Sequence, residues 1–132
     1  MTPEELPDPV VRAAELALER KARDVVVLDL RGISSATDYF VLATGNSDIQ
    51  VRAIADHVIE RLKAEVGERA DHVEGLEGGR WVLMDYIDFV VHVFHPQARE
   101  FYQLEGLWGD APRVTFEDPD DGGSRVDSPS PA

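Results

Sequence analysis

The chain has 132 residues, with 13 Lys and Arg against 26 Asp and Glu, so its formal net charge is −13. This length fits one domain, and the 43% of hydrophobic residues suffices for a packed core, which excludes wholesale disorder. No stretch approaches the roughly 20 apolar residues of a membrane span, and the acidic N-terminus is unlike a signal peptide. We therefore expect a cytoplasmic protein, in which the absence of cysteine excludes disulfides and thiol nucleophiles.

The charge pattern argues against a protein that binds nucleic acid directly. The basic residues are scattered singly along the chain, whereas neutralising phosphates requires a basic face. An acidic surface instead steers the protein toward basic partners and repels RNA. We expect little or no direct contact with nucleic acid, and a basic protein standing between the chain and any nucleic acid it acts near.

The N-terminal part of the chain predicts one helix followed by two strands. Asp8 and Pro9 are typical of a helix start, with Asp8 as N-cap and Pro9 at the first helical position. Apolar residues then recur at helical spacing to about Lys21. Two β-branched runs, residues 24–30 and 37–44, predict buried strands.

The second helix carries the strongest local pattern. Ser47 and Gln50 form a capping box, with Ser47 at the N-cap, and Gly67 is a natural residue to end the helix. One apolar stripe connects these ends and should face the core. The predicted stripe consists of Ile49, Ile54, Val58, Ile59, Leu62 and Val66.

The C-terminal part predicts three more strands and a short helix. Residues 72–74 can form a short strand, and residues 80–84 and 88–94 form a hairpin. Pro96 opens the helix, and residues 116–132 have the composition of a disordered acidic tail. The folded domain would span residues 1–115. The order α-β-β-α-β-β-β-α implies an α/β fold with a mixed sheet of about five strands and helices packed on it.

Histidines do not indicate a metal site. His92 and His95 are three residues apart, so their side chains point apart unless the strand ends between them, and no third ligand lies near in sequence. We expect partly buried, hydrogen-bonded histidines and no metal or other cofactor.

Enzymatic motifs are weak. Backbone N–H groups at Gly45–Ser47, between a strand and a helix, could cradle a phosphate, although capping alone explains Ser47. Asp85 and Asp88 have two residues between them, which does not match two-metal chemistry, and Asp is common beside turns. We predict no catalytic residues, and the alternative that stays open is a nucleotidyltransferase-like enzyme or nucleotide-binding protein.

Aromatic and acidic residues gather around the predicted hairpin. The group lies within fifteen residues and consists of Glu74, Glu77, Trp81, Asp85, Tyr86 and Asp88. Trp and Tyr beside carboxylates are typical of a binding hot spot for a basic protein. The alternative is an ordinary sheet whose aromatic side chains fill the core, and spacing alone does not separate the two.

Several long motifs, in order, resemble the ribosomal silencing factor family, also called Iojap-like. The likeness spans about residues 8–111 and begins with Thr37-Asp38-Tyr39-Phe40-Val41-Leu42-Ala43-Thr44-Gly45-Asn46-Ser47. It continues through Gln50-Val51, Ile54-Ala55-Asp56, Glu74-Gly75, residues 81–86 and 88–94, Phe101-Tyr102 and residues 104–108.

The resemblance implies a translational repressor rather than a catalyst. Members bind a large-subunit ribosomal protein (number fourteen) and block joining of the small and large ribosomal subunits, especially under nutrient limitation. It also implies a nucleotidyltransferase-like fold without the catalytic residues, and a homodimer when free. It favours Trp81, Asp85 and Tyr86 as partner-binding residues, together with the acidic residues around them.

One position departs from the family pattern. Members usually have Gly where this chain has Ile87. Because a β-branched residue resists positive φ, we expect the turn of the hairpin to have another geometry.

Overall fold

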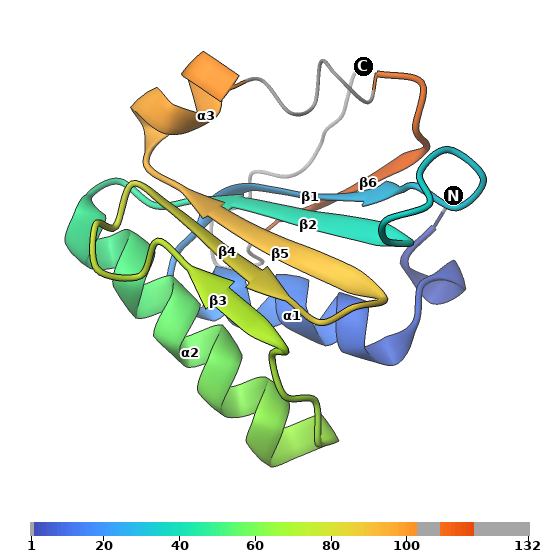
Figure 1. The fold of residues 1–132 in the computed structure, drawn as a ribbon, viewed down its shortest axis with the longest axis horizontal. Helices are drawn as coiled ribbons and strands as arrows, with labels where there is room; N and C mark the ends of the chain where they lie inside the picture. Colours follow the sequence, from blue (N-terminus) through green and yellow to red (C-terminus); the bar gives the residue numbers. More distant parts are fainter. Residues whose placement is uncertain (1, 103–108, 118–132) are drawn as a thin grey trace.

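A six-stranded mixed sheet forms the centre of the computed structural model, which describes residues 2–102 and 109–117. Helices α1 and α2 cover one face of the sheet, and α3 lies over the other face (Figure 1). The elements are η1 Pro3–Glu5, α1 Asp8–Glu19, β1 Arg23–Asp29, β2 Tyr39–Thr44, α2 Asp48–Val66, β3 His72–Glu74, β4 Trp81–Asp85, β5 Phe89–Phe94, α3 Pro96–Tyr102 and β6 Arg113–Phe116. No helix among the described residues has the length and apolarity needed to cross a bilayer.

The sheet has the strand order β3-β4-β5-β2-β1-β6. Strands β2 and β5 pair in parallel at its centre, and the other neighbouring strands described here pair antiparallel. A parallel pair requires a crossover connection, which α2, β3 and β4 supply. The predicted hairpin and the strands expected at residues 24–30, 37–44 and 72–74 are confirmed, with ends that differ by at most two residues.

The sheet has six strands, one more than the expected number of about five. Strand β6 pairs with β1, placing Phe116 opposite Val25 and Val114 opposite Val27. Phe116 therefore belongs to the sheet and not to the predicted tail of residues 116–132. The rest of that tail, from residue 118 onward, lies outside the described residues, as does Leu104, which the sequence assigns to the short helix.

Alternating side chains build two hydrophobic clusters, one on each face. Along β5, Phe89, Val91 and Val93 face α1 and α2, while Phe94 faces α3. The cluster on the α3 side contains Val26, Leu28, Leu30, Leu42, Phe94, Ala98 and Ala111, with Phe40 and Trp81 packed against it. The sheet thus has one deeply covered face and one face with partly exposed aromatic rings.

The first helix begins one residue earlier than expected. Pro7 is the N-cap, with no side-chain hydrogen bond, and its carbonyl accepts from the N–H groups of Val10 and Val11. Asp8 is the first helical residue, not the cap, and its charge still lies in the first turn, where the helix dipole favours it.

The start of α2 is capped by Ser47 as predicted. The Ser47 hydroxyl accepts from the Gln50 N–H at 3.1 Å, but the Gln50 Oε1 accepts from the N–H of Asn46, at 2.6 Å, rather than from that of Ser47. The Gln50 Nε2 also donates to the carbonyls of Arg20 and Lys21. Gln50 therefore joins the start of α2 to the end of α1.

The predicted apolar stripe of α2 is wrong at both ends. Ile49 is 70% exposed and Val66 is 40% exposed. The buried residues of α2 are Val51, Ile54, Ala55, Val58 and Leu62. Ile49 precedes Val51 by two residues, which places it about 200° around the helix, away from the core. Val66 is in phase with Leu62 but lies in the last turn.

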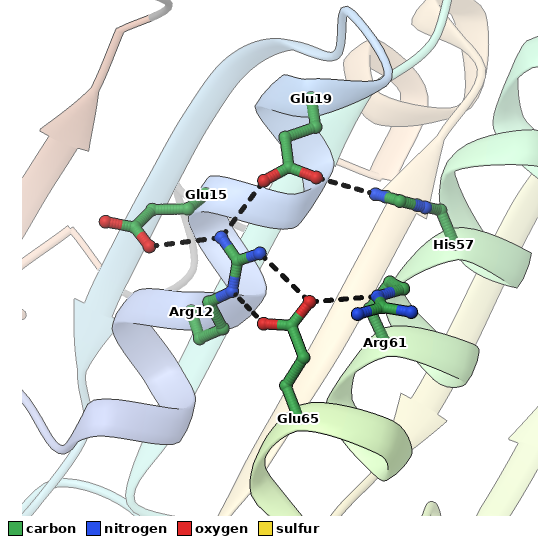
Figure 2. Close-up of polar contacts among 6 residues, drawn as sticks. All are labelled: Arg12, Glu15, Glu19, His57, Arg61 and Glu65. Atoms are coloured by element: carbon green, nitrogen blue, oxygen red, sulfur yellow. Dashed lines mark hydrogen bonds and ion pairs between the residues drawn. The ribbon is translucent and has the colours of Figure 1, made fainter.

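An ionic cluster joins α1 to α2 on their outer side (Figure 2). Arg12 donates to both carboxylate oxygens of Glu65, at 2.6 and 3.1 Å, and to Glu19 at 3.0 Å. Arg61 contacts Glu65 at 2.9 Å, and His57 contacts Glu19 at 2.9 Å. The hydrogen bonds from Arg12 and Arg61 lower the pKa of Glu65 to about 2. Because Arg12 binds Glu65 in a bidentate manner, the two helices are fixed in register.

The turn of the β4–β5 hairpin keeps a positive φ, so the expectation of another geometry at Ile87 is wrong. Ile87 has φ 74°, and it is the centre of a three-residue turn in which the Asp88 N–H donates to the Tyr86 carbonyl at 2.9 Å. The Ile87 N–H donates to Asp85 Oδ1 at 2.7 Å, and Thr37 Oγ1 donates to the Ile87 carbonyl at 3.0 Å. These bonds from two sides hold a conformation that costs about 1–3 kcal/mol for such a residue.

Replacing Ile87 by Gly should stabilise the protein. The side chain is 63% exposed, so little buried area is lost, and Gly adopts positive φ without strain. We expect the free energy of unfolding to rise by about 0.5–1 kcal/mol, because relief of strain exceeds the added entropy of the unfolded chain. Urea denaturation measures this change. As a control, Ile33→Gly, at an exposed position without positive φ, should lower the stability, and a lower stability of Ile87→Gly would contradict the prediction.

Candidate partner-binding site

Strand β4 directs its alternate side chains to opposite faces of the sheet. Val82 and Met84 lie in the core beneath α1 and α2, while Trp81 packs on the α3 side and is only partly buried. The antiparallel register with β5 places Trp81 opposite Phe94 and Leu83 opposite His92. Trp81 therefore lies among side chains of β5 on the less covered face.

Four rings gather on this side of the sheet, and we call them the aromatic face. They are Phe40, Trp81, His92 and Phe94. The Trp81 and Phe94 rings stack at 5.3 Å, and His92 stacks with Phe94 at 5.9 Å. Phe40 meets His92 edge to face at 4.5 Å. His92 and Phe94 are buried, whereas Trp81 and Phe40 are partly exposed, so these two rings form the outer surface.

His92 carries the main polar contact of the aromatic face. Its Nδ1 accepts a hydrogen bond from the Trp81 Nε1–H at 3.0 Å, so the expected hydrogen bond is confirmed, while the ring is buried rather than partly buried. The rings around it are apolar, and this burial lowers the pKa of His92 to about 4. The side chain is therefore neutral at pH 7, and the proton lies on Nε2.

The other histidines serve separate structural contacts. The Nδ1 of His95 accepts from the Gln97 N–H at 3.3 Å at the start of α3, so His95 is hydrogen-bonded as expected. His72 contacts Glu74, and His57 belongs to the ionic cluster. Within residues 2–102 and 109–117, no group of three or more His, Asp or Glu side chains is arranged to hold a metal ion.

The structure separates Tyr86 from Trp81. Tyr86 continues the inward alternation of Val82 and Met84, is 5% exposed, and stacks on Phe89 at 4.8 Å. Burial raises the pKa of Tyr86 to about 12. Its side chain therefore supports the hairpin from the core face and does not share a surface with Trp81.

The acidic candidates border the aromatic face or the adjoining loops. Asp85 ends β4, and its carboxylate accepts from the Ile87 N–H, which is the turn role that the sequence predicts for it. Glu74 pairs with Leu83 in the register of β3 and β4, so it lies on the same face. Asp88 is exposed in the hairpin turn, and Glu77 is exposed in the loop before β4.

The glycine-containing turn before α2 is used internally. The Gly45 N–H donates to the Phe94 carbonyl at 2.9 Å, and the Asn46 N–H donates to Gln50 Oε1. A Cβ on Gly45 would lie 3.0 Å from the Val51 backbone nitrogen, which is a tight contact, so glycine favours close packing of the turn on α2. Hydrogen-bond donors that a phosphate would need at Gly45 and Asn46 are already occupied, which disfavours the nucleotide-binding alternative.

Comparison with known proteins identifies the family. A family described as "Ribosomal silencing factor during starvation" matches residues 3–131. The chain is 48% identical over 99 residues to ribosomal silencing factor RsfS of Halalkalibacterium halodurans, covering 75% of this chain and 84% of that protein. A crystal structure of a Chromobacterium violaceum protein matches with a TM-score of 0.72 at 40% identity, covering 76% of this chain and 83% of that one.

A more distant relative is also named for the ribosome. The mouse protein "Mitochondrial assembly of ribosomal large subunit protein 1" is 31% identical over 96 residues, which cover 70% of this chain and 42% of that protein. The class that the fold and these matches define is a ribosome-related protein. The chain belongs to the ribosomal silencing factor family, as the motifs at residues 37–47 and 81–94 predict. The likeness of this fold to nucleotidyltransferases stays a prediction.

Acid should destabilise the protein through His92. Its pKa is about 4 in the folded state against an ordinary 6.5, so the unfolded chain takes up the proton first as pH falls. The contribution of neutral His92 to the free energy of unfolding is fully present above pH 6.5 and is lost toward pH 4. At pH 4.5 the loss is about 2–3 kcal/mol. Urea denaturation at pH 7 and 4.5 measures the loss. The variant His92→Phe does not titrate and should lose less over this range, whereas an equal loss in both proteins would contradict the assignment.

Proposed function

We propose that this chain is a cytoplasmic translational repressor that binds a large-subunit ribosomal protein, number fourteen, and blocks joining of the ribosomal subunits, especially under nutrient limitation. The observation that carries this proposal is the match of residues 3–131 to a family described by ribosome silencing during starvation. The name of the mouse relative, which refers to assembly of the large ribosomal subunit, supports the choice of the large subunit. Obstruction requires bulk in the right place and slow dissociation, so the mechanism uses no cofactor and no catalytic residue.

The aromatic face is the surface that we assign to the partner. Trp81 presents a large and rigid ring that is partly exposed, and such rings dominate the energy of protein interfaces. Asp85 and Glu74 lie on the same side of the sheet, and Asp88 and Glu77 are exposed in the adjoining loops. An apolar centre with an acidic border fits a basic ribosomal protein. A homodimer in the free state stays a prediction.

Subunit joining is the direct test of this function. Purified small and large subunits are mixed with and without the chain, and the joined ribosomes are measured by sedimentation. We expect fewer joined ribosomes and co-sedimentation of the chain with the large subunit. Binding to the small subunit, or unchanged joining at saturation, would refute the proposal. Calorimetric titration with nucleotides and Mg²⁺ should give no heat, whereas the enzyme alternative expects a binding signal.

Truncation of Trp81 should weaken binding strongly. The variant Trp81→Ala removes the exposed ring, and we expect a loss of about 2–4 kcal/mol in binding free energy, typical of a hot spot. Titration with purified large subunits measures it, and thermal unfolding confirms that the variant is folded. The control Ile49→Ala truncates an exposed apolar residue on α2, outside the aromatic face, and should leave the affinity unchanged. If a folded Trp81→Ala variant binds with wild-type affinity, the partner contacts another surface of the protein.

Added salt should slow association more than it speeds dissociation. The chain carries a net charge of −13, and attraction between opposite charges is screened beyond about 8–10 Å at physiological ionic strength. Stopped-flow mixing with the ribosomal protein at increasing salt measures both rate constants. An association rate that does not change with salt would mean that the acidic surface does not guide the encounter.

A further inference from the structure

The indole of Trp81 is held by a buried side chain that lies beneath it. The Trp81 Nε1–H donates to His92 Nδ1 at 3.0 Å, although the strand register places Trp81 opposite Phe94 and not opposite His92. The bond therefore runs diagonally across the β4–β5 pair, while Phe94 supports the indole by stacking. Together these two contacts fix both the plane of the indole and its rotation within that plane.

Holding the indole in this way lowers the stability of the core. With Nδ1 as acceptor, the neutral His92 ring carries its proton on Nε2, and Nε2 is buried without a hydrogen-bond partner in the part of the chain that the structure describes. A buried N–H without a partner is destabilising. A phenylalanine at this position would pack against Phe40 and Phe94 without that penalty. Packing alone therefore does not account for a histidine here.

An oriented indole is useful when Trp81 meets a partner. A large side chain at a surface loses rotational freedom on binding, and fixing it beforehand removes that loss from the binding free energy. His92 is 3% exposed, so it lies behind Trp81 and cannot form a large contact with a partner itself. Its influence on binding must pass through the Trp81 ring.

We propose that His92 is a positioning residue of the partner-binding surface, which fixes the indole of Trp81 in its binding orientation through the Nδ1 hydrogen bond. This inference rests on the proposed function, in which Trp81 contacts the large subunit. His92 lies in the core, but its role in this inference is to raise the affinity for the partner and not to stabilise the fold.

The variant His92→Phe is the main test, because it keeps an aromatic ring and removes the acceptor. We expect the stability to be unchanged or higher at pH 7, while the dissociation constant for purified large subunits rises about fivefold to tenfold. The indole N–H resonance of Trp81 in a ¹H–¹⁵N spectrum should shift, and its hydrogen exchange should accelerate. The chain has two tryptophans, so Trp81→Phe assigns the resonance. A residue with a purely structural role would not weaken binding while stability is maintained.

Two further variants keep the test decisive. His92→Asn retains an acceptor oxygen near the position of Nδ1, and should keep the indole resonance and most of the affinity despite poorer packing. Val91→Ala loosens the same strand on its opposite face, where Val91 is fully buried, and should change the dissociation constant by less than about twofold. If the binding affinity of the three variants falls in the same order as their free energy of unfolding, the positioning role is overturned.

The outcomes separate this inference from the proposed function. If Trp81→Ala binds like the wild type, the proposed contact surface is wrong, and with it the role of His92 in binding, whatever the indole spectrum shows. If Trp81→Ala weakens binding while His92→Phe keeps wild-type affinity and an unshifted indole resonance, only the positioning role is overturned. If His92→Phe does not fold, weak binding by a folded His92→Asn with an unshifted indole resonance would overturn it.

Discussion

The parallel pairing of β2 with β5 is the constraint on which the rest of the molecule depends. It runs from Tyr39 opposite Phe89 to Thr44 opposite Phe94, and backbone bonds at Asp38 and Gly45 extend it at both ends. Parallel neighbours cannot be joined by a tight turn, so the chain crosses over through α2 on one face and returns through β3 and β4. The long helix is thereby committed to one side (Figure 1), and the rings of Phe40, Trp81 and Phe94 gather on the other.

Local sequence patterns predicted the elements that depend on nearby residues. They failed where the conformation depends on a segment far away in the chain. The Ser47 cap and the β-branched strands are readable because each depends on residues within a few positions. Strand β6 has only four residues and exists because β1, nearly 90 residues earlier, provides its partner. Ile87 keeps positive φ because Thr37, 50 residues away in the chain, binds its carbonyl. No rule based on neighbours in sequence could have shown either contact.

The candidate site was predictable in part for the same reason. Strand alternation alone places Trp81 and Asp85 on one face, and continuing it by one residue places Tyr86 on the other. The resemblance to the family had grouped all three residues in one binding surface. The contribution of Phe40 required knowledge that β2 lies beside β5, because Phe40 reaches His92 only across that pairing. The hydrogen bond between Trp81 and His92 is diagonal, so a simple list of opposite residues would not reveal it.

The short edges of the sheet determine how copies of this protein can meet. An edge strand exposes unpaired backbone groups, and a long flat edge invites another chain to add a strand without limit. Among the described residues the edges are β3, with three residues, and β6, with four residues that follow Pro112. Such edges provide few backbone bonds for a neighbour. Fibres that grow by adding strands to an edge are therefore disfavoured, and contacts between copies depend on side-chain surfaces.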